Sequence, residues 1–186
     1  MVIVHIMRAL ALILLLTAPA GAAGPPPEPA GYRLDAYHAP TPLTVAGKAA
    51  IDTAEAQRLW AAQDAVFIDV TAAVRRPAAL PAGTIWSPTP HLDIPGSLWL
   101  PDSGRGALSP EIEAWFHANL ARITAARRDT PLVFYCRADC WMSWNATKRA
   151  LEWGYGTARW YRDGADGWRK AALPLAAAQP PSDAPR

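Results

Sequence analysis

Two short and nearly continuous apolar segments, residues 65–70 and 131–135, constrain the fold of this chain most strongly. Such runs are typical of strands that are buried on both faces, and parallel sheets covered by helices bury their strands in this way. Segments with helical spacing lie between the two runs and after the second one. Strands that alternate with helices predict an α/β domain with three layers, α/β/α, around a mainly parallel central sheet.

The expected helices begin and end at recognisable signals. Asp52, with Glu55 three positions later, is typical of a capping box at a helix start. Ser109 before a proline marks a second start, and a helix that follows Trp141 ends at Gly154. Apolar residues recur at helical spacing along the second helix and predict its core face: Ile112, Trp115, Phe116, Leu120 and Ile123. Shorter strands are expected at 97–100 and 157–161, and a last short helix from 164.

The first 22 residues have the pattern of a secretory signal peptide. Arg8 precedes an apolar run from Ala9 to Leu16, and small residues follow up to Ala22. The run is shorter than the roughly 20 residues that span a bilayer, so cleavage near Ala22 is favoured over a membrane anchor. Removal of Arg8 lowers the formal net charge by one, from +2 to +1, and the basic residues form no cluster typical of nucleic-acid binding. We therefore expect an exported protein of the periplasm.

Only two cysteines occur, Cys136 and Cys140, four positions apart. In an oxidising compartment an even number of cysteines usually indicates structural disulfides. A bridge between these two closes a very short loop, so its entropic stabilisation is near the bottom of the usual range. The pair therefore favours chemistry at sulfur, while two inert core thiols or a plain disulfide remain the alternative.

Cys136 directly follows the second apolar segment, at the start of a loop that leads into a helix. Backbone N–H groups of such a loop point inward and, with the helix dipole, favour an anion. A cysteine at that place is stabilised as the thiolate, which is the nucleophile, and Arg137 and Lys148 can add positive charge. Asp69 ends the first segment at the same edge of the sheet, where α/β folds place functional groups. The alternative interpretation of Asp69 is an acid that accepts hydrogen bonds from a loop.

Four segments follow one another along the chain: the strand Ile68–Val70, the turn His91–Ser97, the segment Val133–Arg137 with a cysteine at the end of its strand, and the ending from Leu151 to Trp168. In this order they resemble motifs of the rhodanese superfamily. Within that superfamily the chain is most similar to the small exported group named after a CXXCW motif and an association with catabolism dependent on pyrroloquinoline quinone (PQQ). The second similarity is carried by residues 31–33, 84–86, 94–101 and 140–146.

The residue patterns and the resemblance together predict the organisation of the chain: a signal peptide over 1–22, an extended tether and strap over 23–50, a rhodanese-like domain over 51–175 and a flexible tail over 176–186. The resemblance also implies an activity. Cys136 is the position that carries a persulfide, and sulfane sulfur passes from a small donor to a thiol, including a protein thiol. The implied partner is a periplasmic PQQ-dependent dehydrogenase or a cytochrome c.

The loop after Cys136 departs from the family pattern. Three residues, not two, separate the cysteines, and Asp139 places an acid where an anionic donor such as thiosulfate binds. Trp141 or Met142 takes a position that a cation often holds. By resemblance, the expected substrate contacts come from Arg137, Ala138, Asp139, Trp141, Met142 and Asp69. Cys140 adds a second thiol that is able to resolve a persulfide or a mixed disulfide.

Two functions are consistent with the sequence. The first is an exported thiol protein that performs persulfide transfer or thiol–disulfide chemistry. In it Cys136 is the nucleophile, Cys140 the resolving thiol and Trp141 a cover of the site. The second is a non-catalytic binding or maturation accessory of a periplasmic PQQ dehydrogenase or cytochrome c.

Cys136, Cys140 and His91 are one ligand short of the usual four of a structural zinc site, so we expect no metal. No phosphate-binding loop or dinucleotide fingerprint occurs, so we expect no cofactor.

Overall fold

The computed structural model describes residues 24–185, and the predicted signal peptide, 1–22, lies outside these residues. The helices are α1 (Thr53–Ala61), α2 (Pro110–Ile123), α3 (Trp141–Glu152) and α4 (Gly164–Lys170). The strands are β1 (Thr44–Val45), β2 (Lys48–Ala49), β3 (Val66–Asp69), β4 (Leu92–Asp93), β5 (Leu98–Trp99), β6 (Leu132–Tyr135), β7 (Arg159–Trp160) and β8 (Ala176–Ala177). Within the described part of the chain, no helix is both long and apolar enough to cross a membrane.

Four parallel strands form the central sheet, in the order β5–β3–β6–β7. The two predicted apolar runs are β3 and β6, which pair from Val66 opposite Leu132 to Asp69 opposite Tyr135. The prediction of an α/β domain around a mainly parallel sheet is confirmed. The pairing brings the carboxyl ends of β3 and β6 together, so Asp69 and Cys136 lie at the same edge of the sheet.

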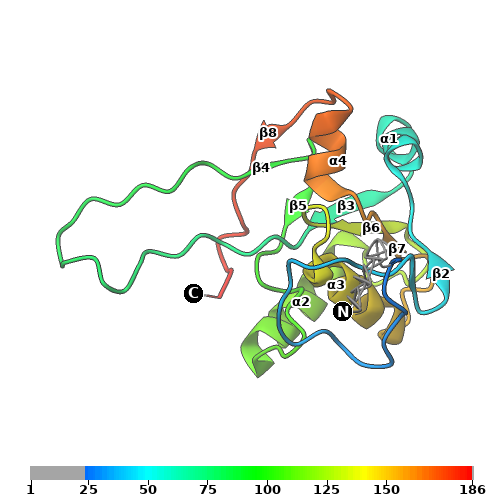
Figure 1. The fold of residues 1–186 in the computed structure, drawn as a ribbon, viewed down its shortest axis with the longest axis horizontal. Coiled ribbons are helices and arrows are strands. Elements are labelled where there is room, and N and C mark those ends of the chain that lie inside the picture. Colours follow the sequence, from blue (N-terminus) through cyan, green and yellow to red (C-terminus); the bar gives the residue numbers. More distant parts are fainter. Residues whose placement is uncertain (1–23, 186) are drawn as a thin grey trace, which may run out of the picture.

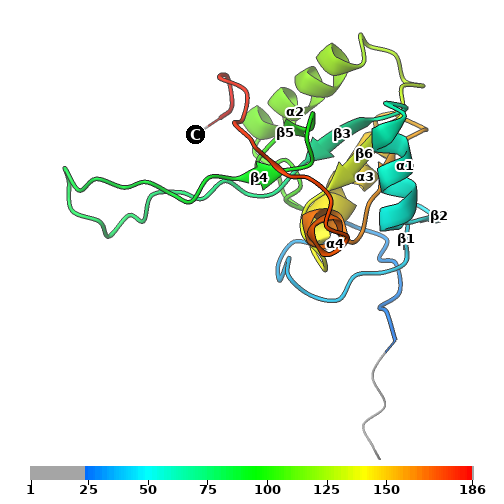
Figure 2. The same cartoon turned by 90° about the horizontal axis from the view of Figure 1, so that it is seen from above.

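The helices form two layers on opposite faces of the central sheet (Figures 1 and 2), and alternate residues of β3 and β6 are buried in two separate clusters. Helices α2 and α3 cover one face, where Ile68 and Phe134 are buried. Helices α1 and α4 cover the other face, where Phe67, Val133 and Trp168 are buried together. Each central strand is therefore buried on both faces, which explains why its sequence is apolar without alternation.

Predicted capping residues begin two of the helices. Asp52 accepts a hydrogen bond from the backbone N–H of Glu55 at 2.8 Å, but the carboxylate of Glu55 binds Arg58 instead of reaching back. The capping box is therefore only half formed, because the arginine offers Glu55 a charged partner. The Ser109 hydroxyl accepts from the backbone N–H three residues later at 3.3 Å. Gly154 ends α3 with a φ of +90°, which glycine adopts without strain.

The N-terminal strap, residues 24–50, is held against α3 by buried side chains of that helix. The side chain of Asn145 accepts from the backbone N–H of Arg33 at 2.9 Å and donates to the carbonyl of Arg33 at 2.8 Å. The guanidinium of Arg149 lies 4.2 Å from the ring centroid of Tyr32 and donates to backbone carbonyls of the loop before α2. The strap is therefore tied to the helix by contacts that are specific in geometry.

The middle of the strap lies over the cysteine loop, residues 136–140. The Tyr37 carbonyl accepts the backbone N–H of Trp141, the first amide of α3, at 2.8 Å. His38 forms an antiparallel bridge with Cys140. The strap thus uses backbone hydrogen bonds to close the end of the helix at which Cys140 lies.

The long loop between β3 and β4 projects from the body as an arm, residues 71–91 (Figures 1 and 2). Ile85 of the arm is 95% exposed. After the arm, β4 pairs antiparallel with β8, with Leu92 opposite Ala177. The segment that we expect to be a flexible tail therefore begins with a short strand.

Candidate active site

The two cysteines meet at the carboxyl end of β6. Cys136 follows the last residue of that strand, and Cys140 is the N-cap of α3. Their Sγ atoms are 2.7 Å apart, both thiols are free, and each residue is only 1% exposed. This separation lies between a covalent S–S bond of about 2.05 Å and nonbonded contact, which is about 3.5–4.0 Å even between carbon atoms. A small rotation of either side chain is therefore enough to bring the sulfurs to bonding distance.

Cys140 is the sulfur whose surroundings favour an anion. The hydrogen bond from the Cys136 thiol is the main cause that lowers the pKa of Cys140, and burial opposes it. Backbone N–H groups of Met142, Arg137 and Ser143 lower the same pKa further. Two of these amides belong to the first turn of α3, where the helix dipole favours negative charge. The side chain makes no ordinary capping hydrogen bond, so these amides act on the large sulfur atom as dipoles at longer range.

Cys136 is the protonated partner. The pKa of Cys136 is raised well above its ordinary value because its hydrogen bond to Cys140 holds the proton and because the thiol is buried. The negative charges of Cys140 and Asp69 raise it further, and a hydrogen bond from the Thr71 hydroxyl at 3.4 Å partly opposes them. The sequence predicts stabilising amides around Cys136, whereas the structure has them around Cys140.

Hydrogen bonds to segments outside the cysteine loop explain this difference. The backbone N–H of Ala138 donates to the carboxylate of Asp166 at 3.2 Å. The N–H of Trp141 donates to the carbonyl of Tyr37 at 2.8 Å. Two amides that the sequence assigns to an anion at Cys136 are therefore occupied by other partners.

The charged side chains of the loop point away from the sulfurs. The Asp139 side chain is 59% exposed, with its Oδ1 atom 3.6 Å from the guanidinium of Arg162. The Arg137 side chain is 61% exposed and lies 3.7 Å from the carboxylate of Asp166. The expected acid beside the reactive sulfur is therefore not found there, because the ion pair with Arg162 and a φ of +49° hold Asp139 at the surface.

The two large residues after Cys140 lie in different clusters. Trp141 packs edge-on against Trp144, with ring centroids 5.4 Å apart, in a cluster with Val45 and Trp160. Met142 shares the core cluster of both cysteines. The sequence predicts Trp141 as the cover of the site, but in the structure its indole is buried among other aromatic rings and the strap takes the covering position.

Asp69 connects the end of β3 to two loops. Its Oδ1 atom accepts from the backbone N–H of Thr71 at 2.7 Å, and its Oδ2 atom lies 2.8 Å from Nε2 of His91. The His91 ring stacks on Trp99, with ring centroids 4.0 Å apart. Asp69 thus accepts loop hydrogen bonds, and its charge also raises the pKa of Cys136.

A second buried carboxyl group, Asp93, lies in the same region. Among the described residues its Oδ2 atom has no hydrogen-bond partner. Burial and the charge of Asp69 raise the pKa of Asp93 to about 6, against the opposing effect of His91. The charge beneath this edge of the sheet therefore changes near pH 6.

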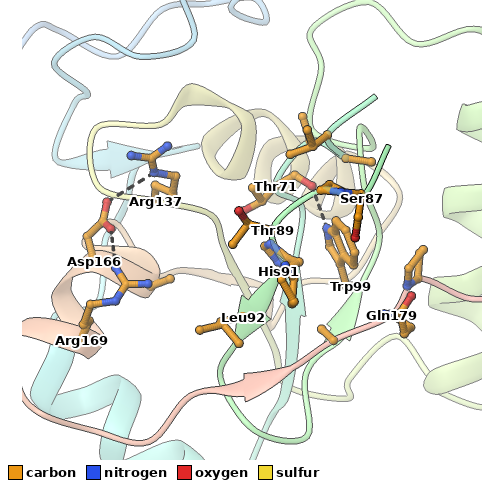
Figure 3. A pocket seen from close by; sticks show the side chains of 18 residues that line it. Thr71, Ser87, Thr89, His91, Leu92, Trp99, Arg137, Asp166, Arg169 and Gln179 are labelled. Carbon is orange, nitrogen blue, oxygen red and sulfur yellow. Dashed lines mark hydrogen bonds and ion pairs between the residues drawn. The ribbon is translucent and has the colours of Figure 1, made fainter. Parts of the chain in front are cut away.

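A cavity of about 810 Å³ is lined by Arg137, the residue after Cys136, and by Thr71 and Trp99, which follow or end strands β3 and β5 (Figure 3). Its central residues and the charged group at one end are Thr71, His91, Trp99, Arg137, Asp166 and Arg169. Thr71 lines the cavity and also donates its hydroxyl to the Sγ atom of Cys136. The Thr71 side chain therefore separates the cavity from that sulfur.

Sequence reasoning missed several residues of this cavity. A signal existed for Thr71, which lies two positions after Asp69 at the carboxyl end of a predicted strand. Asp166 lies in the first turn of a short helix and accepts a hydrogen bond from the Ala138 amide. No pattern in the sequence predicts this contact. Trp99 lies in the strand that the sequence predicts at 97–100, but its place in the cavity is evident only once the pairing of β5 with β3 is known.

The side chains weighed for a metal site do not converge. His91 contacts Asp69, whereas the sulfurs of Cys136 and Cys140 contact each other. Over residues 24–185, no group of three or more His, Cys, Asp or Glu side chains is placed to bind a metal ion.

The family model of the rhodanese-like domain matches residues 52–171, which is more than half of the chain. No curated protein matches the chain. Among solved structures, the human single-domain sulfurtransferase TSTD1 is 24% identical over 65% of this chain and 95% of that chain, with a TM-score of 0.38. A variant of EanB in complex with hercynine is 20% identical over 70% of this chain and 32% of that chain, with a TM-score of 0.47. An uncharacterised protein from Saccharomyces cerevisiae is 19% identical over 66% and 91%, with a TM-score of 0.39. These three structures are all less than 25% identical to the chain, with TM-scores below 0.5.

Proposed function

Because the chain belongs to the rhodanese-like domain family, whose model matches residues 52–171, we propose that it takes up sulfane sulfur and performs thiol–disulfide chemistry at Cys136 and Cys140. Cys136 carries the persulfide, and Cys140 is the second thiol of the pair. The substrate is a small sulfur donor or a protein thiol. The place of action is the periplasm, which the signal-like sequence of residues 1–22 supports.

The observation that carries this proposal is the approach of two free sulfurs to 2.7 Å at the carboxyl end of a parallel sheet. Ligands of open α/β sheets bind outside this end of the strands. The cavity of about 810 Å³ opens there, and Thr71 both lines it and donates its hydroxyl to the Cys136 sulfur. A rotation of Thr71 therefore admits a small donor to the sulfur.

The charges around Cys136 disfavour a dianionic donor such as thiosulfate. The charges of Cys140 and Asp69 are negative, and both raise the pKa of Cys136. The two arginines of the cavity, Arg137 and Arg169, both lie beside Asp166, at 3.7 and 3.1 Å. The persulfide of a low-molecular-weight thiol is therefore the favoured donor.

The test is peptide mass spectrometry of reduced protein after reaction with an alkyl persulfide and, separately, with thiosulfate. In the Cys140→Ser variant, where no second thiol consumes the product, we expect the Cys136 peptide to gain the mass of one sulfur atom. The alkyl persulfide should label it at least tenfold faster than thiosulfate. Cys136→Ser, checked for native circular dichroism, is the matched control and should take up no sulfur. A Cys136 peptide of unchanged mass in both the wild type and Cys140→Ser, with no sulfide released, contradicts the proposal.

The burial of both sulfurs favours a second candidate, a binding or maturation accessory of a periplasmic PQQ dehydrogenase or cytochrome c. Cys136 and Cys140 are each 1% exposed, whereas Ile85 of the arm is 95% exposed. Exposed apolar side chains that project from the body are suited to contact a partner protein. Calorimetric titration with a purified dehydrogenase or cytochrome of the same cells tests this. Binding that is lost in Ile85→Asp and kept in Cys136→Ser supports the accessory role, and no binding by the wild type contradicts it.

A further inference from the structure

The fate of a persulfide on Cys136 follows from the second sulfur beside it. We propose that the pair reduces the persulfide: Cys140, as the thiolate, attacks the Sγ atom of Cys136, sulfide leaves, and a Cys136–Cys140 disulfide remains. This inference rests on the proposed function and names its product, which is sulfide released inside the site rather than sulfur handed to an outside thiol. A reduced dithiol protein of the same compartment then returns the disulfide to two thiols.

The geometry suits an attack within the pair. The two Sγ atoms are 2.7 Å apart, and both residues lie on ordered backbone, one at the end of β6 and one at the N-cap of α3. An outside thiol has to displace the covering residues before it reaches the same sulfur, because both cysteines are buried. Reaction with a group already held in contact gains the advantage of an intramolecular step.

The surroundings of each sulfur decide which one attacks. Cys140 lies at the N-terminus of a 12-residue helix with no acid in its first turn, and first-turn amides face it. Cys136 lies on the side of Asp69, to which it is linked through Thr71: the Thr71 hydroxyl donates to Cys136, and the Thr71 amide donates to Asp69. The same contrast lowers the pKa of Cys140 and raises that of Cys136. Because the thiolate is the nucleophile, Cys140 attacks.

The access routes assign the other role to Cys136. Thr71 lines the cavity and contacts the Cys136 sulfur, so a donor in the cavity meets Cys136 first. Cys140 is closed off by the strap, through its bridge with His38 and the hydrogen bond from the next amide to Tyr37. Sulfur therefore enters at Cys136, and Cys140 receives no donor directly.

The two steps balance in atoms and electrons. First, a donor R–S–SH gives its outer sulfur to Cys136. The Cys140 thiolate takes the proton of Cys136 through the contact between the two sulfurs, a bond forms between Sγ of Cys136 and the outer sulfur, the S–S bond of the donor breaks, and the proton passes on to the leaving R–S⁻. Second, the Cys140 thiolate bonds to Sγ of Cys136, the bond from Sγ to the outer sulfur breaks, and HS⁻ leaves. The outer sulfur gains two electrons, and the two cysteine sulfurs together lose two. The dithiol reductant later supplies two electrons and the protons that restore the pair.

A single-turnover experiment with the reduced wild-type chain, freed of reductant and kept without oxygen, tests the inference. The probe is an alkyl persulfide at slightly less than one equivalent. We expect one sulfide for each persulfide consumed, the loss of both thiols, and a disulfide between two tryptic peptides, since trypsin cleaves at Arg137 between the cysteines. The doubly substituted variant, Cys136→Ser with Cys140→Ser, measures the spontaneous decay of the donor for subtraction.

Substitution of one sulfur separates the two proposals. Cys140→Ser should keep a persulfide on Cys136 and release no sulfide until an outside dithiol is added. A stable persulfide on Cys136 of the wild type, with Cys140 still a free thiol, overturns the inference and leaves the proposed function standing. Equal sulfide release by the wild type and Cys140→Ser overturns it as well. If neither protein takes up sulfur, both proposals fail. If a variant does not fold, the ratio of sulfide released to persulfide consumed by the wild type still tests the inference.

The pH dependence of the second step reports which sulfur attacks. The rate of sulfide release by the wild type should rise with pH through a pKa below that of an ordinary cysteine, about 8.5. A rise centred at or above that value contradicts the assignment of the attacking thiolate to Cys140. A structural role of Cys140 alone predicts no sulfide release at any pH.

Discussion

Replacement of Asn145 by alanine tests whether the strap controls access to Cys140. The buried Asn145 side chain accepts from the Arg33 N–H at 2.9 Å and donates to the Arg33 carbonyl at 2.8 Å. A third hydrogen bond, to the Gly104 carbonyl at 3.1 Å, does not involve the strap. Two of the three bonds that alanine removes therefore attach the strap to α3.

The expected size of the effect follows from those two bonds. A neutral hydrogen bond contributes about 1 kcal/mol to stability, so the docking of the strap loses about 2 kcal/mol. Since about 1.4 kcal/mol corresponds to a factor of ten, the strap opens about 30-fold more often. If opening precedes the reaction in rapid equilibrium, Cys140 is alkylated about 30-fold faster in Asn145→Ala than in the wild type.

The assay is timed alkylation of the reduced protein by iodoacetamide, with the two cysteines resolved as separate tryptic peptides. Asn119→Ala is the matched control, because Asn119 is also a buried helical asparagine but donates to the Trp115 carbonyl within α2. It should lower stability without speeding alkylation of Cys140. Equal Cys140 rates in the wild type and Asn145→Ala, or the same acceleration in Asn119→Ala, refute the role of the strap.

Three further results are expected. Thr71→Val keeps the shape of the side chain but removes the hydroxyl that donates to Cys136. Sulfur uptake from an alkyl persulfide, followed by quenched-flow mass spectrometry, should therefore slow about fivefold, the equivalent of about 1 kcal/mol. An unchanged uptake rate contradicts this role of Thr71. The pKa of Asp93 is raised in the fold from 3.8 to about 6, so the native state binds the proton more tightly and loses stability as pH rises through that interval. In urea titrations, the free energy of unfolding of Asp93→Asn should therefore exceed that of the wild type above about pH 6 and equal it below about pH 4. A difference between the two proteins that does not change with pH contradicts the account. Arg149→Met removes the donors to buried carbonyls and the contact with Tyr32, and should destabilise the protein by about 2–4 kcal/mol in urea; a loss below about 1 kcal/mol is the contrary result.

The fold is predictable from the sequence where its causes are local. The runs that become β3 and β6 are apolar over consecutive positions, and the caps at Asp52 and Ser109 depend on residues within three positions. Parallel pairing follows from the alternation of strands and helices. The α/β/α architecture therefore needs no information about distant contacts, whereas the half-formed box at Asp52 depends on where one arginine side chain, Arg58, lies.

The arrangement of the candidate site is less predictable, because its causes lie far apart in the sequence. The presence of two cysteines after a buried strand is visible in the sequence, but the different surroundings of the two sulfurs are not. The Ala138 amide is bound by Asp166, 28 positions away, and the first amide of α3 by the strap at Tyr37. Arg162 likewise holds Asp139 at the surface. The sequence context of each of these partners carries no sign of its role.

The reduction potential of the Cys136–Cys140 pair tests most directly the central claim, that the two sulfurs react rather than hold structure. The amides around Cys140 stabilise its thiolate and so favour the reduced form of the pair, which raises the potential. We predict a value between roughly −270 and −120 mV, the range of thiol–disulfide exchange proteins. A value below about −300 mV, typical of structural disulfides, contradicts the claim.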